Sequence, residues 1–160
     1  KILKNVKAIN VSLKSPVPIF IKIAPDLNDG NVTEILSVCE ENNVSGLIAT
    51  NTTINPKTLK NPNSFKGGLS GKPLYNQSNK ILRLLAKRKK ESTVLIGVGG
   101  IFSAAEIYEK IMMGASAVQI YTSFIYNGPT HIKKMEIELK NLLLNDGYSS
   151  INEAVGGLIR

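Results

Sequence analysis

Two apolar segments separated by a short amphipathic stretch constrain the fold of this 160-residue chain more than any other feature. The first reads Val94-Leu95-Ile96-Gly97-Val98-Gly99-Gly100, and the second reads Val118-Gln119-Ile120-Tyr121-Thr122. Each has the length of a buried strand and ends in small or polar residues, so together they predict a βαβ unit. Glycine lets backbone N–H groups approach an anion closely, and loops after consecutive strands of α/β barrels commonly bind phosphate. We therefore expect a phosphorylated cofactor or substrate.

Four strand-like segments alternate with helical periodicity along the chain. We expect the strands at residues 18–24, 45–50, 93–98 and 117–121. They are nearly continuous in Ile, Val, Leu and Ala, which is typical of parallel strands buried on both faces. Apolar residues recur at helical spacing after each strand, and also ahead of the first in residues 2–13. The pattern predicts four consecutive βα units behind an opening amphipathic helix.

The number of strands leaves two architectures open. Four parallel strands make either a small doubly wound sheet or half of a (β/α)8 barrel, because they cannot close a barrel of eight by themselves. In a barrel the opening helix would follow a fourth strand, which favours the C-terminal half of a (β/α)8 TIM barrel. The predicted fold class is therefore α/β, with four parallel strands alternating with helices.

Local signals mark the ends of several helices. Ser103 and Glu106 form an S-x-x-E capping box ahead of the third helix, and Ser150 and Glu153 indicate a short capped helix near the end. Asn145-Asp146-Gly147 is a stop signal for the helix before it.

The connection between the second and third strands is unusually long. Its excess lies in residues 54–71, which are rich in Asn, Pro, Lys and Gly and have little periodicity. Loops of this length usually serve as lids or binding loops, so we expect a lid here.

Composition narrows the function further. The net charge of +8 is spread along the chain, and its one dense cluster, Lys87-Arg88-Lys89-Lys90, ends a helix where cations complement the macrodipole. No aromatic residues interleave with it, so no nucleic-acid partner is expected. The given sequence has no long apolar run or signal-peptide pattern. Its single cysteine, Cys39, shares a helical face with apolar residues, so we expect a core residue and no metal site.

Polar residues interrupt the apolar pattern at the ends of the first two strands. Lys22 stands inside an apolar run, and a buried ammonium is costly unless an anion pairs with it. Such an anion is either a flavin's N1–C2 carbonyl edge, which turns anionic on reduction, or a structural carboxylate. The second strand ends in Thr50-Asn51-Thr52-Thr53, where the Asn amide offers a donor and an acceptor to a polar heterocycle. Turn and cap chemistry also explains such a cluster.

Taken together, the motifs of this chain closely resemble the C-terminal half of dihydroorotate dehydrogenase. They occur in that family's order, cover nearly the whole chain, and span residues 21–27, 50–53, 67–74, 96–101, 114–122 and 127–129. Residues 1–160 would then be the C-terminal half of a single FMN-binding TIM-barrel domain, with the N-terminal half outside this chain. The resemblance implies oxidation of dihydroorotate to orotate with FMN in pyrimidine biosynthesis.

The resemblance also assigns roles by motif position. Lys22 would approach the flavin ring, and Thr50 would contact it through its strand-end backbone. The FMN ribityl phosphate would be surrounded by Gly71, Gly100, Tyr121 and Thr122, the last two through backbone N–H groups. The substrate pyrimidine would be hydrogen-bonded by Asn51 and Thr52.

Three features resemble the membrane-associated, quinone-reducing class 2 enzymes: the Pro-Leu after Leu-Ser-Gly-Lys, the Ala-Pro-Asp after Lys22, and the ending at residues 147–156. Class 2 enzymes use a serine base, but no residue here matches its motif, so no catalytic residue is assigned to this chain. The base and the quinone-binding helices would lie in the missing part. His131, the only histidine, is expected to be a surface or capping residue. The resemblance implies peripheral association with the mitochondrial inner membrane, or with the cytoplasmic face of a bacterial inner membrane.

Two other functions remain open on the sequence. One is a related FMN barrel acting on another pyrimidine, such as the flavin domain of dihydropyrimidine dehydrogenase. The other is a phosphate- or flavin-binding module without catalytic activity.

Overall fold

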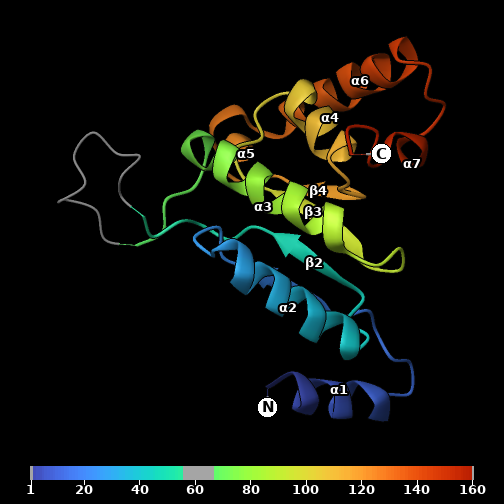
Figure 1. Ribbon diagram of the computed structural model, residues 1–160. Coiled ribbons are helices and arrows are strands. Elements are labelled where there is room, and N and C mark those ends of the chain that lie inside the picture. Colours follow the sequence, from blue (N-terminus) through green and yellow to red (C-terminus); the bar gives the residue numbers. More distant parts are fainter. Residues whose placement is uncertain (1, 56–66, 160) are drawn as a thin grey trace.

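A computed structural model describes residues 2–55 and 67–159 of the chain (Figure 1). Its four strands form one parallel sheet in the order β1-β2-β3-β4. The strands are β1 (Phe20–Ile23), β2 (Gly46–Ala49), β3 (Val94–Val98) and β4 (Ala117–Gln119). All four predicted strands are present, and each is shorter than the range predicted for it from the sequence.

Helices follow the strands in sequence. They are α1 (Ile2–Ser12), α2 (Asp29–Glu41), the 3-10 turn η3 (Lys72–Leu74), α3 (Tyr75–Arg88), α4 (Ala104–Met112), α5 (Thr122–Asn127), α6 (Pro129–Asn145) and α7 (Ile151–Ala154). The short α5 was not expected from the sequence, because it offers too few residues for a periodic pattern. The four predicted βα units and the opening helix are confirmed.

The first core lies between the sheet and the helices α2 and α3. The strand register places Ile21, Leu47 and Leu95 in one row across the sheet. Leu47 and Leu95 are fully buried, and apolar side chains of both helices pack on this row. Burying a leucine contributes about 1.5–3 kcal/mol, so this face fixes α2 and α3 against the strands. Cys39 belongs to this cluster, as its helical spacing predicted.

A second core joins α4, α6 and α7 beside β4. Ile107 and Ile111 of α4 pack with Met135 and Leu139 of α6, and Ala154 of α7 completes the cluster. The spacing of these residues puts them on the inner stripe of each helix.

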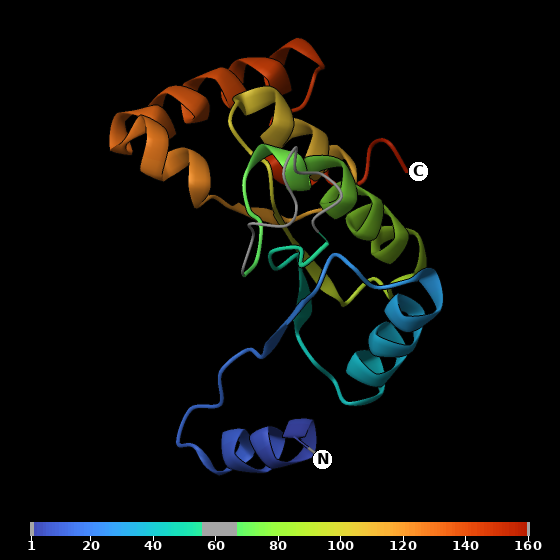
Figure 2. The same cartoon turned by 90° about the vertical axis from the view of Figure 1, so that its left-hand side faces the viewer.

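The other face of the sheet is open, which corrects the prediction of strands buried on both faces. The register aligns Lys22, Ile48 and Ile96 on this face, and all three side chains are partly or largely exposed. The reason is that α2 and α3 lie on one side of the strands (Figure 2), and no described element covers the opposite side. In a closed barrel this face would point to the interior.

Two of the three predicted helix-end signals differ in detail from expectation, and the third is confirmed. Ser103 caps α4 by accepting a hydrogen bond from the Glu106 N–H, but the Glu106 carboxylate accepts from the Phe102 N–H instead of the Ser103 N–H. Ser150 makes no side-chain cap, and the Glu153 carboxylate accepts from the backbone N–H and the hydroxyl of Ser149. The stop signal at residues 145–147 is confirmed, since α6 ends at its first residue.

Across residues 2–55 and 67–159, no helix is long and apolar enough to cross a membrane. Most of the predicted lid, residues 54–71, lies outside the described residues. Thr53, just ahead of this segment, forms an antiparallel bridge with Leu69 near its end.

Candidate functional site

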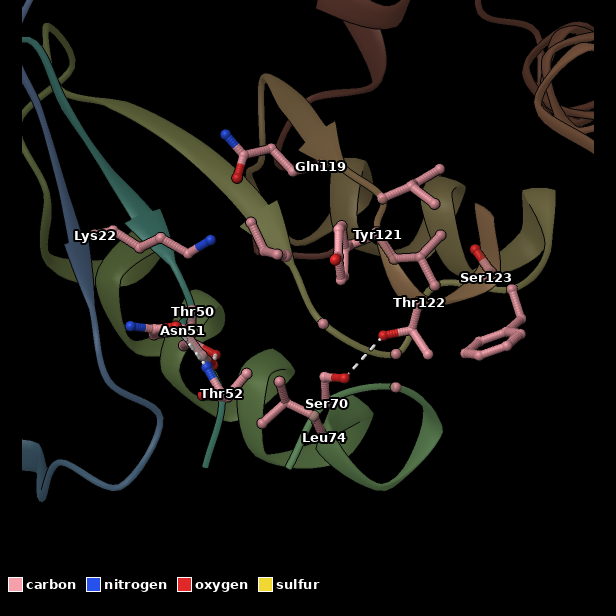
Figure 3. A pocket seen from close by; sticks show the side chains of 17 residues that line it. Lys22, Thr50, Asn51, Thr52, Ser70, Leu74, Gln119, Tyr121, Thr122 and Ser123 are labelled. Atoms are coloured by element: carbon pink, nitrogen blue, oxygen red, sulfur yellow. Dashed lines mark hydrogen bonds between the residues drawn. The ribbon is translucent and has the colours of Figure 1, made fainter. Parts of the chain in front are cut away.

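A pocket lies at the carboxyl ends of the strands (Figure 3). The sequence-predicted site residues all line it: Lys22, Thr50, Asn51, Thr52, Gly71, Gly100, Tyr121 and Thr122. They come from β1 and from the segments that follow β2, β3 and β4, so the topology brings together residues up to a hundred positions apart. The roles assigned to them remain predictions.

Two glycines at one end of the pocket stand where a side chain would collide with neighbouring residues. Gly100 has φ 73°, and a Cβ atom there would lie 2.5 Å from the Cβ of Tyr75. Gly71 has φ 80°, and its Cβ would lie 3.1 Å from Cγ2 of Thr122. Both positions therefore require glycine, by conformation and by contact. Backbone from two loops can thus approach a ligand closely.

These loops are joined by direct contacts. Thr122 donates a hydrogen bond from its hydroxyl to Ser70 Oγ at 3.0 Å, which links the start of α5 to the segment before α3 (Figure 3). Ser70 and Ser123 also line the pocket but were missed by the sequence analysis, since an isolated serine carries no pattern.

Ser123 has an unsatisfied hydroxyl. Its Oγ is buried and has no hydrogen-bond partner among the described residues. A buried hydroxyl without a partner costs roughly 1–3 kcal/mol. Ser123 follows Thr122 in the sequence and lies at the same end of the pocket.

The segment after β2 continues the backbone ladder into the pocket. The Thr50 N–H donates to the Val98 carbonyl at 3.2 Å, and the Asn51 N–H donates to the Ile23 carbonyl at 2.8 Å. Asn51 Oδ1 accepts from the Thr52 N–H at 2.9 Å, which is the turn chemistry that the sequence left as an alternative. Thr50 is fully buried, so the segment is held rigidly enough to present polar atoms to a ligand.

A carboxylate missed by the sequence analysis anchors this segment. Asp26 accepts hydrogen bonds from the Thr53 hydroxyl, from the Ile54 N–H at 3.0 Å and from Gln77 Nε2 at 2.9 Å. Burial opposes the charge of Asp26, but these three donors outweigh it and lower the pKa of the carboxyl group. The partners lie 27 to 51 residues away, so only the fold reveals them.

Lys22 lines the pocket with an exposed side chain, which corrects the expectation of a buried ammonium. Its strand position points it to the open face of the sheet, where no described carboxylate lies within ion-pair distance. The structural carboxylate partner considered from the sequence is therefore not found among the residues described.

His131 contacts the loop after β3 from the start of α6. His131 Nε2 lies 3.0 Å from the Phe102 carbonyl oxygen and ties α6 to the loop after β3, in keeping with a structural role. The described residues contain no group of three or more His, Cys, Asp or Glu side chains placed to hold a metal ion.

The parallel strands, the covering helices and the glycine-lined pocket at the strand ends define a protein of the α/β-barrel class. The family model for dihydroorotate dehydrogenase matches residues 1–143, and the chain belongs to this family.

Named relatives agree with this placement. A dihydroorotate dehydrogenase (quinone) from Cereibacter sphaeroides is 42% identical over 156 residues, which are 97% of this chain and 44% of that protein. One from Helicobacter acinonychis is 46% identical over 143 residues, 89% of this chain and 40% of that protein. The crystal structure of a ligand-free DHODH from Eimeria tenella superposes with a TM-score of 0.91 at 34% identity, covering 99% of this chain and 49% of that one. The chain thus spans less than half the length of these relatives.

Proposed function

We propose that the full-length protein carrying this chain oxidises dihydroorotate to orotate in pyrimidine biosynthesis, with FMN as cofactor and a quinone as final electron acceptor. The observation that carries the proposal is the pocket itself. It gathers the flavin and substrate residues expected from the family at one edge of the sheet. The identity to quinone-dependent relatives supports the choice of acceptor.

The residues present suit FMN. Gly71 and Gly100 line the end of the pocket where the ribityl phosphate would bind, and both are held in conformations that favour glycine. The backbone N–H groups of Tyr121 and Thr122 would donate to the same phosphate. Thr50 would hold the flavin through its backbone, and the Lys22 ammonium would stabilise negative charge at the N1–C2 carbonyl edge. When bound, FMN supplies a hydride acceptor.

Asn51 and Thr52 would bind the pyrimidine. The Asn51 amide can both donate and accept, and it follows a buried residue that fixes its place in the pocket. Asp26 would act through Thr53 and Ile54, holding the backbone beyond Thr52 in place.

The remaining parts of the reaction fall outside this chain in our proposal. The serine base that removes the substrate proton, the quinone site and the peripheral membrane association belong to the missing part of the protein. The location would be the mitochondrial inner membrane, or the cytoplasmic face of the inner membrane in a bacterium.

An assay of the purified full-length protein tests this function. We expect one bound FMN and a dihydroorotate-dependent reduction of a short-chain quinone, with orotate formed in equal amount. Turnover of another dihydropyrimidine but not of dihydroorotate would identify a related barrel. Stoichiometric FMN with no turnover of either substrate would identify a binding module.

A further inference from the structure

A lysine that the proposed reaction does not use is buried behind the phosphate end of the pocket. Lys110 of α4 is fully buried, and its side chain passes beside Gly97 of β3. A Cβ atom on Gly97 would lie 3.0 Å from Lys110 Cδ, so the absence of a side chain there opens the path for the lysine. The ammonium thereby reaches α3, which packs beside it.

The Lys110 ammonium makes three contacts with α3. It donates to Ser78 Oγ at 2.8 Å and to Asn79 Oδ1 at 2.5 Å, and it lies 5.3 Å from the centre of the Tyr75 ring. No described carboxylate lies within ion-pair distance of it, although the neighbouring Glu109 lends some favourable potential. A buried ammonium held only by neutral acceptors is costly, and burial lowers the pKa of Lys110 to about 8.

Ser78 connects this ammonium to the glycine loop. Because an ammonium can only donate, Ser78 Oγ must accept from Lys110 and direct its own proton elsewhere. The acceptors within reach are the Gly99 carbonyl at 3.4 Å and the Tyr75 carbonyl at 3.3 Å. Lys110 thus favours orientations in which the Ser78 hydroxyl donates to one of these carbonyls. The Gly99 carbonyl belongs to the Gly99-Gly100 turn. Gly100 packs against Tyr75, whose ring also contacts the Lys110 ammonium, so Lys110 lies next to residues that contact both Gly99 and Gly100.

We propose that Lys110 is a positioning residue for the phosphate end of the pocket. Through Ser78 it fixes the Gly99-Gly100 peptide, and its charge adds positive potential behind that peptide. The site therefore favours flavin bearing a phosphate over flavin lacking one. The inference rests on the proposed function, because FMN is the phosphorylated ligand concerned.

The test compares FMN with riboflavin, which lacks the phosphate, on the flavin-free form of the full-length protein. Quenching of flavin fluorescence gives the dissociation constant of each ligand. Lys110→Met keeps the length of the side chain and removes the charge, and we expect it to weaken FMN binding by about tenfold or more. Riboflavin binding should change by less than about twofold. The matched control is Lys134→Met, which removes an exposed lysine of α6 and should change neither constant.

Ser78→Ala provides a second variant for the case in which Lys110→Met does not fold. It should lower the preference for FMN over riboflavin in the same direction. If Lys110 acts through Ser78, the double variant should show a smaller combined loss than the sum of the single ones.

Equal weakening of FMN and riboflavin in both single variants would overturn the inference, because it would reduce Lys110 to a packing role. An unchanged FMN affinity in a folded Lys110→Met protein would do the same. A wild-type protein that binds no FMN would instead bring down the proposed function, and a failure of that kind is seen before any variant is made.

Discussion

Asp26 and Thr53, 27 residues apart, are joined by a hydrogen bond from the threonine hydroxyl to the carboxylate. The bond connects the loop after β1 to the segment after β2, just beyond the proposed substrate residues. Gln77 of α3 donates to the same carboxylate, so Asp26 joins the loop after β1, the segment after β2 and the helix α3. The shape of the substrate end therefore depends on a residue that does not line the pocket.

Replacing Asp26 with asparagine should weaken substrate binding without reducing the FMN content of the protein. The carboxylate accepts from the Thr53 hydroxyl on Oδ1 and from the Ile54 N–H on Oδ2, whereas an amide has only one accepting oxygen, so we expect orotate binding to weaken about 3- to 10-fold. FMN content should stay normal. Asp29→Asn, which removes an exposed carboxylate at the start of α2, is the control. Orotate affinity equal to wild type would show that the anchor has no bearing on the substrate.

The same carboxylate predicts a pH dependence. Because its pKa in the folded protein is lower than the ordinary 3.8, the stability it contributes is present above that value and is lost as the pH falls through the folded-state pKa. The difference in urea stability between wild type and Asp26→Asn should therefore shrink in strong acid. A difference that stays constant from neutral pH into strong acid would contradict this account.

Lys110 predicts a second pH dependence, at alkaline pH. Its folded-state pKa of about 8 lies below the ordinary 10.5, so the unfolded chain holds more protons between these values. The cost of burying the charge is complete below about pH 8 and disappears as the pH rises toward 10.5. Of the groups that face Lys110, Tyr75 has a pKa raised to about 12, by burial and then by its bond to Glu109, and does not titrate in this range. The stability of wild type relative to Lys110→Met should rise between about pH 8 and 10.5, and no relative gain over this range would refute the lowered pKa.

Truncating the proposed substrate residues should weaken orotate binding and leave FMN binding nearly unchanged. Asn51→Ala and Thr52→Ala each leave polar groups of the pyrimidine unpaired, at a cost of about 1–3 kcal/mol. Calorimetry should show weaker orotate binding in both variants, with FMN content near that of wild type. Equal loss of orotate and FMN, or loss of neither, would argue against a substrate-specific role.

Much of this site could be predicted because parallel strands place their carboxyl ends at one edge. Lys22, Thr50 and Gly100 therefore converge wherever the βα units form, and local apolar runs are enough to show those units. The contacts of Asp26 and Lys110 could not be predicted, because they depend on how loops and helices pack across long sequence separations. The exposure of Lys22 could not be predicted either, since an apolar run does not tell which face of a strand will be covered.

The most direct test of the central claim is the rate at which dihydroorotate reduces the bound flavin, followed without oxygen by loss of its visible absorbance. We predict rapid bleaching in the wild-type protein with orotate formed in equal amount, and a rate lower by at least about tenfold, or 1.4 kcal/mol, in Lys22→Ala. Lys134→Ala should match wild type. A flavin-loaded wild-type protein that dihydroorotate does not bleach, or a Lys22→Ala protein with normal FMN content and normal bleaching, would contradict the account.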